Sequence, residues 1–410
     1  MNIKKVAAVG AAFGLAAAGL AVAIPASANP VGNSDGYVLA GSDTIQDVVS
    51  ALANGYTVSG VNVRATANGH VLTSFDAFPN TFGTPGELVE TKPFGPYFER
   101  PSGSGGGISA LSSSIGDSTQ NGATGSYNWT TNGHTYSIQG QVDLARSSAG
   151  PVSNAAGDLE FVPFARDAVD FAIYFGSAVS NTDKTTVEGW GASDIASLLN
   201  SSTGTEALTG SDVVAGFLPQ SSSGTRQFYT TLLGLPGGKN FAPGSSSVAF
   251  SSTYAENDGI AIAAFAAAAN TLSIAGTDAS HLIVVAPFSV AQYTAQFNGI
   301  APSNTTAGLV LGTPFGTAPV TLAAGKVTPN VAYYHDTTWG RDTYIVVPYA
   351  KYNPSSPTYD ADLAQALDPE NDSSLISFYD DDLDITPVGL VKQTFGFLEP
   401  LGVPTRAYHN

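Results

Sequence analysis

Residues 37–55, YVLAGSDTIQDVVSALANG, contain the structural unit on which the rest of the chain is built. The apolar run Tyr37 to Ala40 is typical of a short buried strand. Apolar residues then recur at positions 45, 48, 49 and 52, the spacing of one helix face, and the helix is expected to end near Gly55. Between strand and helix lies the polar turn at 41–44. The stretch therefore predicts a strand, a polar turn and a helix N-terminus, the repeating unit of an α/β fold.

The same arrangement recurs twice. The segment RPSGSGGG at 100–107 precedes a helix-like apolar run from Ile108 to Leu111. The segment SSSGTR at 221–226 precedes apolar residues at helical spacing, at positions 228, 229, 232 and 233. Short β-like runs alternate with helical runs over the remaining chain. We expect α/β units with largely parallel sheets rather than a β-sandwich.

Ser, Thr and Gly at three helix starts suit anion binding. The first turn of a helix exposes unpaired N–H groups with partial positive charge, and hydroxyls beside them add neutral donors, so together they can hold a tetrahedral oxyanion. For any single turn the alternative is that Ser or Thr simply caps its helix. Arginine placement favours the anion, because Arg100, Arg146 and Arg226 lie in or beside such segments. A further segment, QVDLARSS at 141–148, places a carboxylate, a guanidinium and two hydroxyls at an expected strand end.

Taken in order, these segments resemble those of the phosphate-binding proteins of phosphate ABC transporters, in the periplasmic-binding-protein type 2 class (PBP domain). The resemblance covers most of the chain after residue 28. It implies an α/β, two-lobed periplasmic-binding-protein type 2 fold in which each lobe is a mixed, mainly parallel sheet flanked by helices. Lobe one would hold residues 29–166 and 290–410, and lobe two residues 167–289. The segments 161–174 and 282–289 would be the strands that cross between the lobes.

The resemblance also implies a binding site for phosphate or a similar oxyanion in the interlobe cleft. In this family the acid of the segment that Asp143 matches accepts the proton of bound hydrogen phosphate. One departure stands out: Pro219 occupies the position of a family arginine. Either Arg146 or Arg226 takes that role, or phosphate is not the ligand. The implied ligand-binding residues are Ser42, Asp43, Thr44, Ser102, Ser104, Asp143, Arg146, Ser147, Ser223, Gly224 and Thr225.

Composition excludes several other functions. The chain has 410 residues, of which 33 are acidic and 15 basic, and the net charge of -18 would repel a nucleic-acid backbone. It has no cysteine, which excludes disulfides, thiolate zinc sites and a cysteine nucleophile. Its five histidines form no H-x-x-x-H pair, so neither a metal nor a cofactor is expected. The segment 335–342, with His335, Asp336, Arg341 and Asp342, is expected to be a surface turn with solvated ion pairs.

Residues 1–28 have the features of a secretory signal peptide. Lys4 and Lys5 precede an apolar stretch at 6–24, and Ala-Ser-Ala at 26–28 fits a cleavage site. We expect a secreted, extracellular or cell-surface monomer that begins at Asn29 and lacks a lipid anchor, because no cysteine follows the signal. The family resemblance implies an ABC transporter permease as a partner.

Three functions remain open at this point. The first is a non-enzymatic oxyanion receptor for phosphate uptake. The second is a cell-surface or envelope protein of the same fold without a transport role. The third is a secreted phosphatase-like enzyme with Ser42 or Ser104 as nucleophile, which is disfavoured because no histidine or carboxylate cluster stands beside either serine in the sequence. Segments 78–99 and 113–134 are expected to be inserted surface loops, and 299–329 has no predicted place.

Overall fold

A computed structural model of the chain describes residues 30, 32–78, 87–116, 126–201, 203–235, 256–268, 272–273, 275–301 and 305–408. The predicted signal peptide at 1–28 lies outside the described residues. The same holds for parts of the two expected insertions and of the segment at 299–329.

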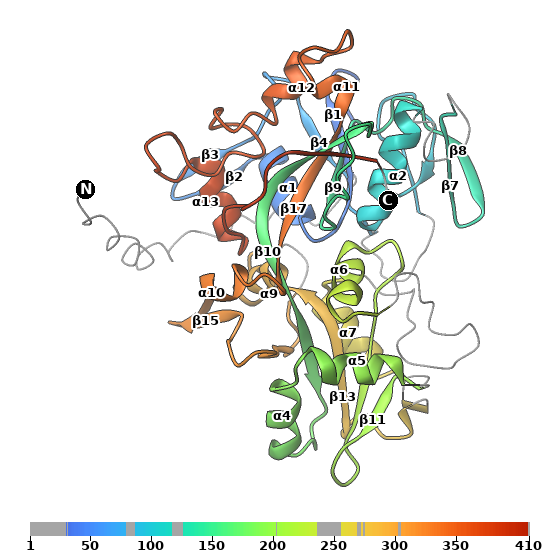
Figure 1. The fold of residues 1–410 in the computed structure, drawn as a ribbon, viewed down its shortest axis with the longest axis vertical. Coiled ribbons are helices and arrows are strands. Elements are labelled where there is room, and N and C mark those ends of the chain that lie inside the picture. Colours follow the sequence, from blue (N-terminus) through green and yellow to red (C-terminus); the bar gives the residue numbers. More distant parts are fainter. Residues whose placement is uncertain are drawn as a thin grey trace.

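One long strand organises the molecule (Figure 1). Strand β10, Leu159–Phe175, has 17 residues and runs through both the upper and the lower half of the view. Its first part, to Ala168, pairs with β17 (Gly340–Pro348), and its second part, from Val169, pairs with β13 (Leu282–Ser289). The change of partner marks the junction, the region where the two halves meet.

The upper half carries the chain before β10 and most of the chain after β17. Its elements are β1 (Tyr37–Gly41), α1 (Gln46–Asn54), β2 (Tyr56–Val58), β3 (Val61–Val63), β4 (Leu72–Ser74), β5 (Leu88–Val89), β6 (Phe98–Glu99), α2 (Gly103–Ile115), β7 (Asn128–Thr131), β8 (His134–Ser137), β9 (Leu144–Ser147), α11 (Tyr349–Tyr352), α12 (Ala361–Gln365), α13 (Pro387–Thr394) and β18 (Thr405–Ala407).

The lower half carries the chain between β10 and β17, and α9 (Val290–Phe297) lies between the halves. Its remaining elements are α4 (Asn181–Glu188), α5 (Ala192–Asn200), β11 (Thr205–Ala207), β12 (Val213–Gly216), α6 (Gly224–Leu232), α7 (Gly259–Ala266), β14 (Val310–Leu311), β15 (Val320–Ala323), β16 (Lys326–Pro329) and α10 (Val331–Tyr334).

The main sheet is mixed, which confirms the α/β class. Its strand order is β11-β12-β13-β10-β17-β9-β1-β4. The pairs β1 with β4, β1 with β9 and β12 with β13 are parallel, whereas every pair made by β10 or β17 is antiparallel. The expected mainly parallel character thus holds for β1, β4 and β9, and the crossing strands depart from it because β10 and β17 run in opposite directions.

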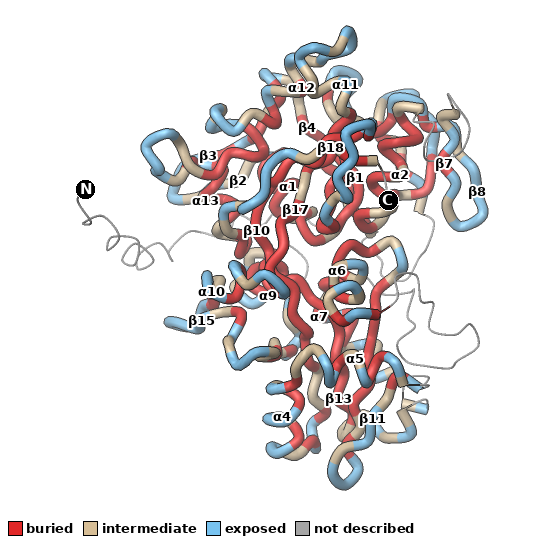
Figure 2. Tube along the Cα trace, in the orientation of Figure 1, coloured by how far each residue is buried: buried red, intermediate tan, exposed pale blue. Residues whose placement is uncertain are grey.

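Separate hydrophobic cores fill the two halves, and Figure 2 shows the buried strands at the centre of each. The upper cores draw on both ends of the chain, for example Leu39 with Phe397 and Val38 with Ala407. The lower cores include Leu309, Tyr333 and Trp339. These residues belong to the segment 309–339, which was assigned to lobe one from the sequence but packs in the lower half. Strand β14 of this segment pairs there with β10.

The expected surface insertions are partly buried. In the described part of the first, Val89, Thr91 and Phe98 are buried, and the second ends in the hairpin of β7 and β8, which buries Trp129 against Phe98. Both segments thus add to the core that covers α2.

Candidate functional site

Two polar turns of the upper half reach the junction because two strands end at the same edge. Strand β1 ends at Gly41 and β9 at Ser147, and the two run parallel with Gly41 beside Arg146. The residues that follow, Ser42 and Ser148, therefore emerge side by side.

Five buried hydroxyl residues, the hydroxyl cluster, meet there: Ser42, Thr44, Ser104, Ser148 and Thr225. Ser42 Oγ donates to Ser148 Oγ at 3.1 Å, and Ser148 Oγ lies 3.3 Å from Ser104 Oγ. Thr44 Oγ1 lies 3.2 Å from Thr225 Oγ1. Because only Thr225 belongs to the lower half, the cluster bridges the two halves.

Three helices begin at this cluster. Ser42 and Thr44 lie just before α1, Ser104 is in the first turn of α2, and Thr225 is in the first turn of α6. Among the described residues, the N-cap residues Ile45 of α1 and Ser102 of α2 make no side-chain capping hydrogen bond, whereas Ser223 caps α6 by accepting from Arg226 N at 2.9 Å. Capping alone therefore accounts for one of the three turns.

Close backbone approach brings α2 and α6 together. Gly105 N donates to the carbonyl of Ser222 at 3.1 Å. A Cβ atom at Gly224 would lie 2.6 Å from Ser148 Oγ and would overlap Ser104 Oγ as well. Glycine at position 224 is thus what allows the two helix starts to meet.

Arg341 of β17 completes the cluster. Its Nη2 donates to Thr225 Oγ1 at 3.0 Å and its Nη1 to the carbonyl of Ser148 at 3.1 Å. Its Nε and Nη2 also donate to Asp167 Oδ2, at 3.2 and 2.9 Å. The guanidinium therefore joins hydroxyl-bearing residues of both halves.

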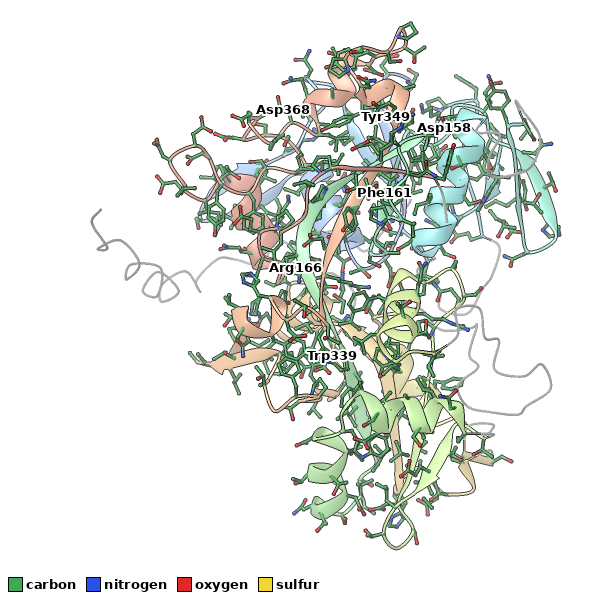
Figure 3. All side chains as sticks on the ribbon, in the orientation of Figure 1. Asp158, Phe161, Arg166, Trp339, Tyr349 and Asp368 are labelled. Atoms are coloured by element: carbon green, nitrogen blue, oxygen red, sulfur yellow. The ribbon has the colours of Figure 1, made fainter. Side chains whose placement is uncertain are left out.

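The expectation of a solvated surface turn at 335–342 is wrong for its second part. Arg341 and Asp342 lie in β17 and are 4% and 8% exposed. Asp342 Oδ1 accepts from Arg166 Nη1 at 3.2 Å. Figure 3 shows Arg166 close to the junction of the two halves, with Trp339 below it. Two buried ion pairs, Arg166 with Asp342 and Asp167 with Arg341, thus connect the neighbouring strands β10 and β17.

Asp167 uses both carboxylate oxygens. While Oδ2 accepts from Arg341, Oδ1 accepts from Ser289 Oγ at 2.9 Å and from Ala291 N at 3.1 Å. This carboxylate balances the charge of Arg341 and attaches the start of α9 to β10.

Two further acidic residues, Asp43 and Glu256, lie close to Thr44. Asn257 Nδ2 donates to Asp43 Oδ2 at 3.1 Å and to Thr44 Oγ1 at 3.3 Å, and Glu256 lies next to Asp43. Burial raises the pKa of Asp43 and raises the pKa of Glu256 well above its ordinary value, and the nearby Asp43 charge raises it further.

Three residues expected in the site make no hydrogen bond to a hydroxyl of the cluster in the described chain: Asp143, Ser147 and, described below, Arg146. Asp143 precedes β9, roughly 16 Å along the chain from Ser148 at about 3.3 Å per residue. It accepts from Val38 N at 2.9 Å and pairs with Lys92 at 2.8 Å. Ser147 Oγ donates to the carbonyl of Ala149 at 2.8 Å.

Arg146 lies behind the turn rather than facing the cluster. All of its N–H groups point to Ser42 O, Leu39 O, Ser74 Oγ, Gly41 O and Phe75 O, at 2.7 to 3.5 Å. Burial lowers its pKa to about 10. Its role is to hold the backbone of the turn. Arg226 Nη1 donates to the carbonyl of Pro219 at 2.8 Å.

The other expected residues lie at or beside the cluster. Ser223 and Gly224 begin α6, Asp43 lies next to Glu256, and Ser102 bridges to Gly41 before α2. Sequence reasoning missed Ser148, Arg341, Asn257 and Glu256. The length of strand β9 could have pointed to Ser148. Asp143 precedes the four-residue strand and Ser148 follows it, so the two residues lie at opposite edges of the sheet.

No family model matches the chain, and no curated protein matches it. The solved structures that it resembles include substrate-binding proteins of phosphate ABC transporters. A phosphate-binding protein from Stenotrophomonas maltophilia is 13% identical, covering 90% of this chain and 91% of that chain, with a TM-score of 0.41. An ABC-type phosphate transport receptor from Vibrio cholerae is 12% identical, covering 80% of this chain and 93% of that one, with a TM-score of 0.34. Likeness this weak does not bear on the ligand of this chain.

The described residues hold no group of three or more His, Cys, Asp or Glu side chains placed to bind a metal ion. Within the same residues, every helix is too short or too polar to cross a membrane.

Proposed function

We propose that this chain is a secreted binding protein for a tetrahedral oxyanion of the phosphate type, held at the hydroxyl cluster. The observation that carries the proposal is the meeting of three helix N-termini, five buried hydroxyls and Arg341 across two halves of the molecule. Oriented N–H groups and hydroxyls stabilise an anion without requiring a full opposite charge.

The hydroxyl contacts are of the kind that an oxyanion can replace. Each Ser or Thr hydroxyl can rotate to donate to a ligand oxygen instead of to its neighbour. Four of the five N–H groups of Arg341 have partners among the described residues, and the remaining Nη1 hydrogen can point to a ligand. An oxyanion held in this way would contact both Ser104 and Thr225 and so join the two halves.

The same geometry favours binding over covalent chemistry. Ser42 Oγ and Ser104 Oγ make their hydrogen bonds with Ser148 and with the backbone, and within the described chain neither bonds to a histidine, lysine or carboxylate. A serine nucleophile needs such a neighbour to remove its proton. We therefore propose a receptor that delivers its ligand for uptake, with an ABC transporter permease as partner, rather than a phosphatase.

Adjacent serines provide a matched test. Ser148 belongs to the hydroxyl cluster and Ser147 does not, although both are fully buried. We expect calorimetric titration of the purified protein to show one site for phosphate, and Ser148→Ala to weaken it about 5- to 100-fold, the equivalent of about 1 to 3 kcal/mol. Ser147→Ala should leave the affinity within about twofold.

The titrations include sulfate, arsenate and acetate. Absence of binding for all four anions contradicts the proposed function. Equal effects of the two serine substitutions contradict the placement of the ligand at the cluster.

A further inference from the structure

Two acidic residues at the junction have three buried carboxyl oxygens without a hydrogen-bond donor among the described residues. Glu256 is 3% exposed, and within the described chain neither of its carboxyl oxygens accepts a hydrogen bond of normal geometry. The same is true of Asp43 Oδ1. Three buried acceptor oxygens without donors are costly, because water no longer solvates them.

The two groups come from opposite halves. Asp43 lies in the turn between β1 and α1, and Glu256 lies just before α7 in the lower half. Asn257 holds them in place, since its Nδ2 donates to Asp43 Oδ2 and its Oδ1 accepts from Ser289 N at 2.7 Å. The carboxyl groups are close enough to hydrogen-bond each other.

Two ionised carboxylates in this position would repel each other, whereas one proton between them turns the repulsion into a hydrogen bond. The surrounding charges do not remove the need for that proton. Arg341 faces both groups from β17 but is already paired with Asp167 on β10. The groups around Asp43 on the upper side are Asp47 of α1 and Arg146 of β9, and the backbone N–H of Thr225 faces Glu256.

We propose that Asp43 and Glu256 form a binding site for one proton, shared across the junction, and that oxyanion binding is linked to uptake of this proton. The second clause rests on the proposed function. When the halves separate, each carboxyl meets water and ionises. When they meet, a shared proton leaves one negative charge beside the hydroxyl cluster instead of two, which lowers the repulsion of an incoming anion.

The proton site itself can be tested without any ligand. At neutral pH the infrared spectrum of the protein should contain a carboxylic-acid carbonyl band that both Asp43→Asn and Glu256→Gln remove, because each amide can donate where the shared proton was. Asp170→Asn should remove a different band, since burial also raises the pKa of Asp170 well above its usual range. Glu206→Gln, at an exposed position on β11, should change nothing. A spectrum that Glu256→Gln leaves unchanged overturns the proton site.

The linkage is tested with phosphate as the probe. The protonation of phosphate changes with pH, and this change is the same for every variant. It therefore cancels when the Kd of the parent protein is divided by the Kd of Glu256→Gln at the same pH. We expect this ratio for the parent protein to rise with pH, by at most about tenfold per pH unit. A ratio that is constant between pH 6 and pH 9 contradicts the linkage. If the band is present but phosphate and sulfate do not bind, the proposed function fails and the proton site stands; binding without the band overturns the proton site alone.

Discussion

Arg341 and Asp167 lie directly opposite each other on β17 and β10, and their buried side chains form an ion pair with 2.9 Å between Nη2 and Oδ2. The pair lies one residue from the point where β10 changes partner from β17 to β13. Since Asp167 also accepts from Ser289 and Ala291, it connects β10, β17 and the start of α9. It is therefore both part of the candidate site and a structural centre of the junction.

Removal of Arg341 alone should be strongly destabilising. Arg341→Met leaves Asp167 buried without its cation, and we expect a loss of about 3 to 5 kcal/mol in the free energy of unfolding. Urea denaturation measures this. Adding Asp167→Asn should recover much of the loss, and Arg64→Met, at an exposed position, should stay within about 0.5 kcal/mol of the parent. A loss below about 1 kcal/mol for the single variant is the contrary result.

Gly224→Ala should disturb the site directly. The added methyl group would overlap Ser104 Oγ and Ser148 Oγ, so the starts of α2 and α6 must move apart. We expect a stability loss of about 1 to 3 kcal/mol, as for other overpacked sites, with phosphate affinity reduced more than about tenfold. Gly189→Ala is the control, because its nearest neighbour would be 3.5 Å away. Parent-like phosphate affinity in Gly224→Ala would show that the two helix starts do not form the site.

Asp143→Asn should leave phosphate affinity within about twofold of the parent. Asp143 lies at the far end of β9, where it binds Val38 N and Lys92. Calorimetric titration decides the matter. A loss of more than about tenfold would give Asp143 the role that the family resemblance implies and would contradict the position described here.

Lys392 should make stability depend on pH. It is fully buried, its Nζ donates to the carbonyl of Phe164 at 2.7 Å, and burial lowers its pKa well below 10.5. The folded state then binds fewer protons than the unfolded state, so stability falls as the pH drops below about 10.5.

Lys392→Met should therefore gain stability relative to the parent as the pH falls from about 10 to 7, by at most about 1.4 kcal/mol per pH unit. Thermal and urea unfolding at several pH values measure the difference. Lys351→Met, at a half-exposed position on α11, is the control. A difference that does not change with pH contradicts a neutral buried Lys392.

Local patterns predicted the three helices, although α2 begins at Gly103, inside the Gly-rich segment that was expected to precede it. The helix expected after residue 44 is α1, those expected at 108 and 228 lie in α2 and α6, and the segment at 282–289 is β13. These elements follow from apolar spacing and turn residues, which act over a few positions. Their convergence on one junction depends on long-range contacts: the parallel pairing of β1 with β9, the bridge from Gly41 to Ser102, and the hydrogen bond from Gly105 N to the carbonyl of Ser222.

Arg341 could not be predicted in the same way. A short polar segment such as GRDT at 340–343 looks exposed, and its burial depends on Asp167, which is 174 residues away in sequence. Long-range charge pairing has no local signature. Asp143 was expected in the site because its segment resembles the Asp-containing segment of the family, although strand β9 separates it from Ser148.

The most direct test of the oxyanion site is anomalous diffraction from crystals soaked in arsenate. We expect a single arsenic peak within hydrogen-bonding distance of Ser104 Oγ, Ser148 Oγ and Thr225 Oγ1, with Arg341 as the nearest cation. A peak at another place, such as beside Asp143 or Arg226, or no peak at the hydroxyl cluster at saturating arsenate, would contradict the account.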